Sequence, residues 1–284
     1  MKNKGIIPIN KPSGWTSFDV VNKIKHLVRP LKVGHLGTLD PMATGVLLVT
    51  VGKATKLFDI MQEKRKTYIA KFKLGVLTDT LDSTGEILEE QEVRGISKSM
   101  VVDAMQKFVG NIEQVPPKYS AKSVNGTRAY TLARNNVDFV LPAKKVTVYN
   151  IELIDFAENV IELKIECGSG TYIRSLGRDI AKELNTVATM TELQRIQVGN
   201  VSVDKCFEVK EIQKEQVFEY VMEINNFLSF EEIKLTEQES KKLLNGLILD
   251  VNVNDGIYKL NDVDDTIALV KIDNFKAKMW LFLG

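Results

Sequence analysis

The feature that most constrains the fold is the apolar run Val46–Val51, which is enclosed between Gly45 and Gly52. It is rich in β-branched residues and has no polar alternation, so it predicts a strand that is buried on both faces. A short apolar strand is expected before it, at 6–9, and an alternating strand after it, at 68–74. A sheet is therefore the framework on which the rest of the first two hundred residues must pack.

Helix and strand patterns alternate through this part of the chain. Residues Thr16 to Asp19 have the form of a capping box, with Asp in place of Glu, and predict a helix that begins there. Further helices are expected at 56–62, 97–109, 129–134 and 174–184, and further strands at 145–154, 160–167 and 190–198. Several strands have antiparallel neighbours, which favours an α/β (α+β) fold with a mixed, largely antiparallel sheet and flanking helices over a doubly wound parallel sheet.

The pattern changes beyond about residue 205. Acidic helical segments are expected first, followed by a helix at 236–244 that Thr236 and Glu239 would cap. Short strands are then expected at 247–253, 256–260, 266–272 and 278–283. This spacing is typical of a small β-barrel-like module, so we predict two domains, 1–228 and 229–284.

Composition excludes several classes of protein. With 44% hydrophobic and 26% charged residues, the chain is typical of a soluble globular protein, and no stretch approaches the ~18 apolar residues of a membrane helix. The apolar run near the N-terminus is too short for a signal peptide. Cys167 and Cys206 lie far apart without a CxxC pattern, and His26 and His35 are the two histidines. We therefore expect a cytoplasmic protein without disulfides or a metal centre.

Charge is distributed unevenly although the net charge is only +1. Residues 1–75 contain fourteen Lys and Arg against four Asp and Glu, a net charge of +10. Residues 201–284 contain ten Lys against sixteen Asp and Glu, a net charge of −6. The basic part could meet a polyanion such as a nucleic acid, or its lysines could simply be solvated helix faces.

The densest cluster of unusual residues is 34–45, where three glycines surround Asp40-Pro41. Pro41 disfavours helical geometry at Asp40, so the carboxylate is expected on an extended or turning segment. A loop held by the strand behind it can present such a carboxylate for catalysis. Asp-Pro is also an ordinary turn initiator, and both interpretations fit the spacing.

No nucleotide cofactor is indicated. Gly45 and Gly52-Lys53 resemble a phosphate-binding loop, but six residues separate the glycines and Ala54 stands where Ser or Thr is needed. The run from Gly168 to Thr171 is too short for a dinucleotide fingerprint.

Five motifs occur in one order along the chain: Asn10-Lys-Pro-Ser-Gly-Trp-Thr-Ser17, Gly34-His-Leu-Gly-Thr-Leu-Asp-Pro41, Lys66-Thr-Tyr68, Gln114-Val-Pro-Pro-Lys-Tyr-Ser-Ala121 and Gly170-Thr-Tyr-Ile-Arg174. Together they closely resemble the bacterial tRNA pseudouridine-55 synthase family, also called TruB, over residues 5 to about 200. The resemblance implies an isomerase that converts the T-loop uridine 55 of tRNA to pseudouridine by base flipping. It also implies a mixed-sheet catalytic domain with an RNA-gripping insertion at 114–143 and a small PUA-like C-terminal module.

The same resemblance assigns roles to residues at the matching positions. Asp40 matches the catalytic aspartate, and Arg174 matches the arginine that pairs with it, orients it and keeps it ionised. Tyr68 matches the tyrosine that lies against the target base, and Leu193 an apolar residue that packs on that base. On pattern alone, Tyr68 and Leu193 are ordinary sheet residues and Arg174 is a surface charge.

Three further residues have supporting roles in this comparison. His35 matches the histidine that fills the space left by the flipped nucleotide, although a loop histidine with a backbone partner fits the sequence equally well. Tyr172 and Lys11 are expected to support the site or to bind the RNA. The family's lysine in the Tyr119-Ser-Ala-x-Lys pattern is displaced here to Lys122, so we assign that amine no role.

The implied reaction needs no cofactor, and the implied partner is tRNA alone, without a membrane, a required protein partner or an oligomer. Two other classes remain open at this point: an RNA-binding or tRNA-folding protein without catalysis, and a subunit of a guide-RNA-dependent synthase. Intact Asp40, Tyr68 and Arg174 argue against the first. The insertion and the short C-terminal module argue against the second.

Overall fold

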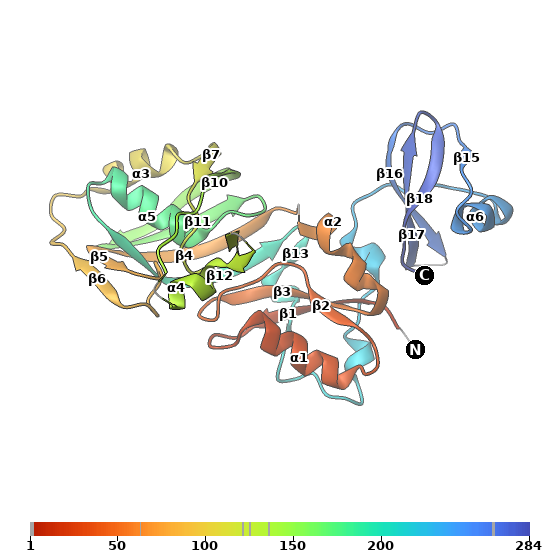
Figure 1. Ribbon diagram of the computed structural model, residues 1–284, viewed down its shortest axis with the longest axis horizontal. Coiled ribbons are helices and arrows are strands. Elements are labelled where there is room, and N and C mark those ends of the chain that lie inside the picture. Colours follow the sequence, from red (N-terminus) through yellow and green to blue (C-terminus); the bar gives the residue numbers. More distant parts are fainter. Residues whose placement is uncertain (1–2, 63, 121, 125, 136, 263–264) are drawn as a thin grey trace. The chain divides into compact units, whose positions relative to one another are not determined.

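A computed structural model describes residues 3–62, 64–120, 122–124, 126–135, 137–262 and 265–284. The chain forms two compact units. The colours of Figure 1 follow the sequence from the N-terminus to the C-terminus. Unit 1 comprises Met1–Asp40, Val46–Gln62 and Asn200–Gly284, and unit 2 comprises Pro41–Gly45 and Glu63–Gly199. Each unit is therefore assembled from segments that are far apart in the sequence.

Unit 1 is built on strand β1 (Gly5–Lys11), which lies between β14 (Phe207–Glu208) and β3 (Thr44–Val51). The pairing of β1 with β14 is parallel, and β2 (Val33–His35) pairs antiparallel with β3. Residues 46–51 are fully buried, which confirms the prediction of a strand covered on both faces.

Helix α1 (Ser17–Leu27) begins where the capping box predicts. The Thr16 hydroxyl accepts the backbone N–H of Asp19, and the Asp19 carboxylate accepts the N–H of Thr16 at 2.8 Å. Val20 and Ile24 on its inner face are fully buried, so one apolar stripe fixes the helix to the core of unit 1.

The C-terminal part of unit 1 contains a curled, four-stranded antiparallel half-barrel in the order β15-β18-β17-β16. Its strands are β15 (Leu249–Asp250), β16 (Gly256–Asp262), β17 (Asp265–Asp273) and β18 (Lys276–Phe282). Helix α6 (Glu237–Leu244) precedes them and carries the predicted capping box of Thr236 and Glu239. A separate apolar core, which includes Leu243 and Val270, holds this part together. The boundary at 228 remains a prediction.

The acidic helical segments expected after residue 205 are wrong. Residues 203–227, all within the described ranges, contain no α-helix: besides strand β14 they form the short 3₁₀ turns η2 (Val203–Lys205), η3 (Val217–Glu219) and η4 (Ile224–Phe227) and irregular backbone. Part of this backbone forms hydrogen bonds with residues far away in the sequence. Met222 forms a β-bridge with Ile6 of β1, and the N–H of Ile224 donates to the Asp265 carboxylate. These long-range bonds replace the intrahelical bonds that the local pattern suggests.

Unit 2 is built around β4 (Lys66–Leu74), which lies between β12 (Ala188–Val198) and β11 (Val160–Cys167), antiparallel to both. Beyond β11 follow β10 (Lys144–Ala157) and the edge strand β7 (Gly110–Gln114), again antiparallel. Thr44 and Gly45, at the start of β3, pair in parallel with Gln194 and Arg195 of β12. The mixed, largely antiparallel sheet with flanking helices is therefore confirmed.

Buried and half-buried residues alternate without exception along β4. Its buried face includes Phe72, on which helix α5 (Ile173–Glu183) packs at Gly177. A Cβ at Gly177 would lie 2.1 Å from the Phe72 ring, so only glycine allows this approach. In Figure 1, α5 lies on this sheet together with α3 (Lys98–Gln106).

The remaining elements are short. They are η1 (Gly52–Leu57), α2 (Phe58–Gln62), β5 (Val76–Thr78), β6 (Ile87–Glu90), β8 (Ser123–Val124), β9 (Thr127–Arg128), α4 (Ala129–Arg134) and β13 (Val201–Ser202). The last residue of the fourth motif, Ala121, lies outside the described residues. A search of the described helices finds none long and apolar enough to cross a membrane.

Candidate active site

The loop that carries Asp40 is fixed by the residues around it in unit 1. Leu36 and Leu39 are buried, and the N–H of Leu36 donates to Leu48 O at 2.9 Å. The Ser17 hydroxyl binds both polar backbone groups of Leu39, accepting its N–H at 2.9 Å and donating to its carbonyl at 3.1 Å. Asp40 follows without regular secondary structure and is half-buried, as the Asp-Pro sequence predicts. The scaffold thus presents this carboxylate from an anchored loop.

Two predicted RNA-contact residues also lie in unit 1. His35 is half-buried at the end of β2, opposite Val49 of β3. Lys11 is fully buried, and its Nζ donates to Pro12 O at 2.9 Å and to Trp15 O at 2.6 Å. This geometry favours the supporting role for Lys11, because its ammonium holds the turn that leads into α1.

Tyr68 and Leu193 lie on the same face of the unit 2 sheet. Tyr68 on β4 pairs with Arg195 of β12, and Leu193 pairs with Ala70 of β4. Their side chains are only 8% and 7% exposed. This is the face on which α5 packs, so the structure brings the predicted tyrosine and leucine to the sheet surface that carries the helix of Arg174.

Positive charge and a thiol flank Tyr68 on this face. Lys66 is buried two residues earlier on β4, and burial together with the guanidinium of Arg195 lowers the pKa of Lys66 to about 8. Opposite Lys66 on β11, burial raises the pKa of the Cys167 thiol to about 11, so this cysteine is a neutral core residue.

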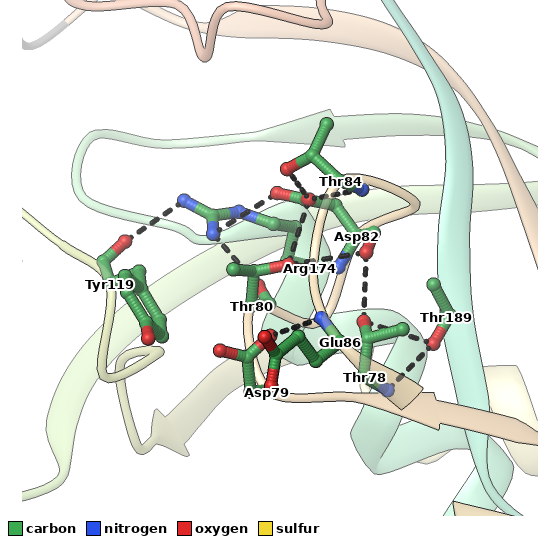
Figure 2. Close-up of polar contacts among 9 residues, drawn as sticks. All are labelled: Thr78, Asp79, Thr80, Asp82, Thr84, Glu86, Tyr119, Arg174 and Thr189. Atoms are coloured by element: carbon green, nitrogen blue, oxygen red, sulfur yellow. Dashed lines mark hydrogen bonds and ion pairs between the residues drawn. The ribbon is translucent and has the colours of Figure 1, made fainter. Parts of the chain in front are cut away.

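Arg174 occupies the first turn of α5 and is 7% exposed. Its Nη1 donates to Thr80 O at 2.8 Å and lies 3.3 Å from the Asp82 carboxylate, and its Nη2 donates to Tyr119 O at 3.2 Å (Figure 2). A cation at the positive end of a helix dipole is unfavourable, so the buried Asp82 carboxylate offsets both that cost and part of the desolvation. The predicted pairing of Arg174 with Asp40 remains a prediction.

Asp82 belongs to the β5–β6 turn, and hydrogen bonds fix its orientation. Its carboxylate accepts the hydroxyls of Thr80 at 2.8 Å and Thr84 at 2.5 Å, as well as the Thr84 N–H at 3.0 Å (Figure 2). Its own carbonyl accepts the Thr78 hydroxyl at 2.8 Å. Sequence reasoning missed Asp82. The signal that could have found it is the dense Asp/Thr run 78–84, which is typical of side-chain-to-backbone turns.

Tyr172, the N-cap residue of α5, is bound through its backbone. Its N–H donates to Gln114 Oε1 at 2.8 Å, and its carbonyl accepts Gln114 Nε2 at 3.1 Å. Gln114 is 1% exposed and was not singled out from the sequence beyond its place in a motif. The Tyr172 backbone is therefore fixed at the start of α5, and its supporting role in the site remains a prediction.

Among the described residues, no group of His, Cys, Asp and Glu is arranged to hold a metal ion. Unit 1 contributes the Asp40 carboxylate on a fixed loop, and unit 2 contributes the buried Arg174 guanidinium and an apolar and aromatic sheet surface. Each of these groups, taken by itself, is of a kind used in acid–base or nucleophilic chemistry on a flat organic ring.

Comparisons with known proteins agree with this chemistry. The N-terminal domain model of the TruB family pseudouridylate synthases matches residues 25–173, more than half of the chain. The chain belongs to the TruB family. The predicted family is therefore confirmed, and with it the class of enzyme, an isomerase.

Relatives within the TruB family align over nearly the whole chain. The "tRNA pseudouridine synthase B" of Clostridium kluyveri is 38% identical and covers 96% of this chain and 93% of its own. The protein of the same name from Clostridium perfringens is 44% identical over 86% of this chain and 83% of its own. That of Mycoplasma mobile is 36% identical over 99% and 95%.

A solved structure supports the TruB fold. The crystal structure of a Cbf5–Nop10–Gar1 complex contains a chain that matches with a TM-score of 0.73 and 21% identity. The match covers 99% of this chain and 83% of that one, and at this identity it concerns the fold alone.

Proposed function

We propose that this TruB family member converts uridine 55 in the T-loop of tRNA to pseudouridine, with Asp40 as the essential carboxylate. The observation that carries the proposal is the long alignment with proteins named tRNA pseudouridine synthase B, which spans the Asp40, Tyr68 and Arg174 motifs. The anchored loop of Asp40 and the buried, oriented guanidinium of Arg174 support it.

The proposed reaction is an isomerisation, so its atoms balance without a second reactant. The C1′–N1 bond of the uridine breaks, the base turns, and a bond forms between C1′ and C5. C5 then loses its proton and N1 gains one, so no atom is added or lost overall. A carboxylate can assist by attacking C1′, by adding to C6 or by removing a proton from the sugar. Each of these routes begins with an ionised Asp40, which Arg174 is proposed to orient.

The chain itself links the two proposed partners. Asp40 is followed directly by Pro41–Gly45, a segment of unit 2, the unit that contains Arg174. Thr44 and Gly45 in this segment pair with β12 next to Leu193.

The proposed pocket for the base consists of Tyr68 and Leu193, which offer an aromatic ring and an apolar side chain on one buried face. A target uridine must leave its stack at a cost of a few kcal/mol, which packing in such a pocket offsets. His35 is proposed to fill the vacated space in the loop, and Tyr172 and Lys11 to support the site.

RNA binding is proposed for the basic N-terminal third and for the insertion at 114–143. We further propose a catalytic domain at 1–228, a PUA-like module at 229–284, and action as a cytoplasmic monomer without a protein partner. Loop RNA is recognised by shape and by splayed bases, which suits an insertion that extends from the edge strand β7.

The test is incubation of the purified protein with an unmodified tRNA transcript, followed by position-resolved mapping of pseudouridine. We expect product at position 55 from the wild type and none from Asp40→Asn, with tRNA affinity kept within a few-fold. Turnover by the Asn variant would exclude Asp40 as the essential carboxylate. Product at other positions only would exclude the T-loop as the target.

A further inference from the structure

The first turn of α5 is held by residues from a distant strand. Its N-cap residue is a tyrosine, whose ring cannot fold back onto the helix N–H groups as Ser, Thr, Asp or Asn does. In a capping box, a Glu or Gln at position N3 accepts the N–H of the N-cap residue. In α5 the N3 residue is Ser175, and the N–H of Tyr172 is instead accepted by Gln114 at the end of β7.

The Gln114 carboxamide binds Tyr172 in two directions. Its oxygen accepts the Tyr172 N–H at 2.8 Å and its nitrogen donates to the Tyr172 carbonyl at 3.1 Å. A backbone N–H can only donate and a carbonyl can only accept, so a single orientation of the amide satisfies both bonds. Two further hydrogen bonds join α5 to the next residue of the chain, Val115. The Ser175 hydroxyl donates to Val115 O at 2.9 Å, and Arg178 Nη2 donates to the same carbonyl at 3.1 Å.

Gln114 also lies at the base of the insertion, and we call the paired residues Gln114 and Lys144 its neck. The chain leaves β7 at Gln114 and returns into β10 at Lys144, and these two residues are paired across the strands. Within the insertion, Tyr119 O accepts Nη2 of Arg174. The insertion therefore contacts α5 through three of its residues: Gln114 binds the Tyr172 backbone, Val115 O accepts from Ser175 and Arg178, and Tyr119 O accepts from Arg174.

We propose that Gln114 is a positioning residue for the reaction, which locks the start of α5, and with it the Arg174 guanidinium, to the neck of the insertion. The inference rests on the proposed function, because Arg174 must take part in catalysis for its position to matter. Helix ends fray when their first N–H groups lose partners, and Arg174 lies within that first turn. An RNA that binds the insertion would then change the position of the Arg174 guanidinium through these contacts.

The test uses Gln114→Met, which keeps the length of the side chain but can form neither hydrogen bond. Gln197→Met is the matched control, since Gln197 also donates to a backbone carbonyl, that of Gly199, from an exposed position in the same unit. The rate constant of pseudouridine formation is measured with enzyme in saturating excess over tRNA, so that an unfolded fraction of enzyme does not alter it. Affinity for tRNA and the thermal midpoint are measured in parallel.

We expect Gln114→Met to lower this rate constant at least tenfold while tRNA affinity changes less than threefold, and Gln197→Met to stay within twofold of wild type. If Gln114→Met does not fold, Gln114→Asn, whose shorter side chain cannot reach both groups, takes its place. A rate within twofold of wild type for the Gln114 variant, beside a slow Arg174→Lys variant, would overturn the inference.

A double-mutant cycle with Arg174→Lys separates positioning from a general structural role. If Gln114 acts through Arg174, Gln114→Met should slow the Arg174→Lys enzyme less than threefold. Full multiplication of the two losses would mean independent action and would overturn the inference. A wild type that forms no pseudouridine in any tRNA would overturn the proposed function itself, which is a different result.

Discussion

Helices α1 and α5 begin in different ways. At α1, Thr16 and Asp19 satisfy one another's backbone groups within four residues of sequence, and α6 repeats this with Thr236 and Glu239. At α5, the corresponding groups and the first side chains are held by residues of β7, the β5–β6 turn and the insertion. The local arrangement only sets where a helix begins, whereas the long-range arrangement also sets where its first side chains point.

The difference suggests which helix ends have a function beyond the fold. A capping box needs only two residues that lie three positions apart in the sequence, and it remains intact when the helix moves as a whole. The α5 start uses a buried glutamine, a buried carboxylate and three backbone carbonyls to fix a few residues. Several supporting contacts around one side chain are expected at a site where the reaction depends on the position of that side chain.

Arg174→Lys should produce the largest effect at the α5 start. A lysine ammonium cannot reproduce the planar arrangement that serves Asp82, Thr80 O and Tyr119 O at once. We expect the single-turnover rate of pseudouridine formation to fall by roughly 100-fold, the order reported for ångström-scale misplacement of a catalytic group. A near-normal rate would show that the long-range arrangement serves stability alone.

Asp82→Asn should weaken the fold more than any change at a capping box. It removes the negative charge of the Asp82–Arg174 pair, and breaking a buried pair in this way costs about 3 kcal/mol or more. Denaturant unfolding gives the change in the free energy of unfolding. Asp19→Asn at α1 is the control, since Asp19 is exposed. Equal losses in the two variants would contradict the distinction between the two helix starts.

Gly177→Ala tests the packing that accompanies the long-range ties. Alanine favours a helix over glycine by about 1 kcal/mol, but its Cβ would meet the Phe72 ring. We expect a net destabilisation of about 1–3 kcal/mol from overpacking, measured by thermal unfolding. A stabilised variant would mean that α5 can shift on β4 without cost.

Thr236→Ala removes the local cap of α6. We expect the free energy of unfolding to fall by about 1 kcal/mol. The rate constant of pseudouridine formation at saturating enzyme should stay within twofold of wild type. A loss of rate here, comparable to that of Arg174→Lys, would show that a locally capped helix start also controls the chemistry.

The smallest effect concerns pH. Hydrogen bonds from the Thr236 side chain and backbone lower the pKa of Glu239 below its usual 4.5. Since the folded pKa lies below the unfolded one, the contribution to stability is present above the unfolded pKa and is lost as pH falls through the folded pKa. Titration of the Glu239 carboxylate by NMR should give a midpoint below 4.5 that rises in Thr236→Ala. A midpoint unchanged by the substitution would exclude the hydrogen bond of the Thr236 hydroxyl as its cause.

Local signals in the sequence predicted a large part of the fold. Period-two alternation marks 68–74, and capping boxes place the starts of α1 and α6 at the observed residues. The segment 203–227 was predicted wrongly because its hydrogen bonds run to β1 and to Asp265. No local pattern contains that information.

The candidate site shows the same division. The Asp40 loop could be anticipated from Asp-Pro and the glycines, and its lack of regular structure is confirmed. The Asp/Thr run 78–84 marks the turn of Asp82, but neither its pairing with Arg174 nor the bidentate role of Gln114 could be anticipated, because these partners lie about 60 to 90 residues apart in the sequence. The roles of Asp40, Tyr68, Arg174, Leu193, Tyr172, His35 and Lys11 came from a family resemblance and remain predictions.

The interleaving of the two units has a consequence for synthesis on the ribosome. Asn10 on β1 donates to Glu208 from 198 residues upstream, and the intervening Glu63–Gly199 belongs to unit 2. At a translation rate of about 5–20 residues per second, β14 is synthesised roughly 10–40 s after its parallel partner β1. During that interval β1 has one edge without this partner, while nearly all of unit 2 is already available to fold. A pause in translation just before residue 207 would prolong the exposure of that edge, and an unpaired strand edge favours aggregation.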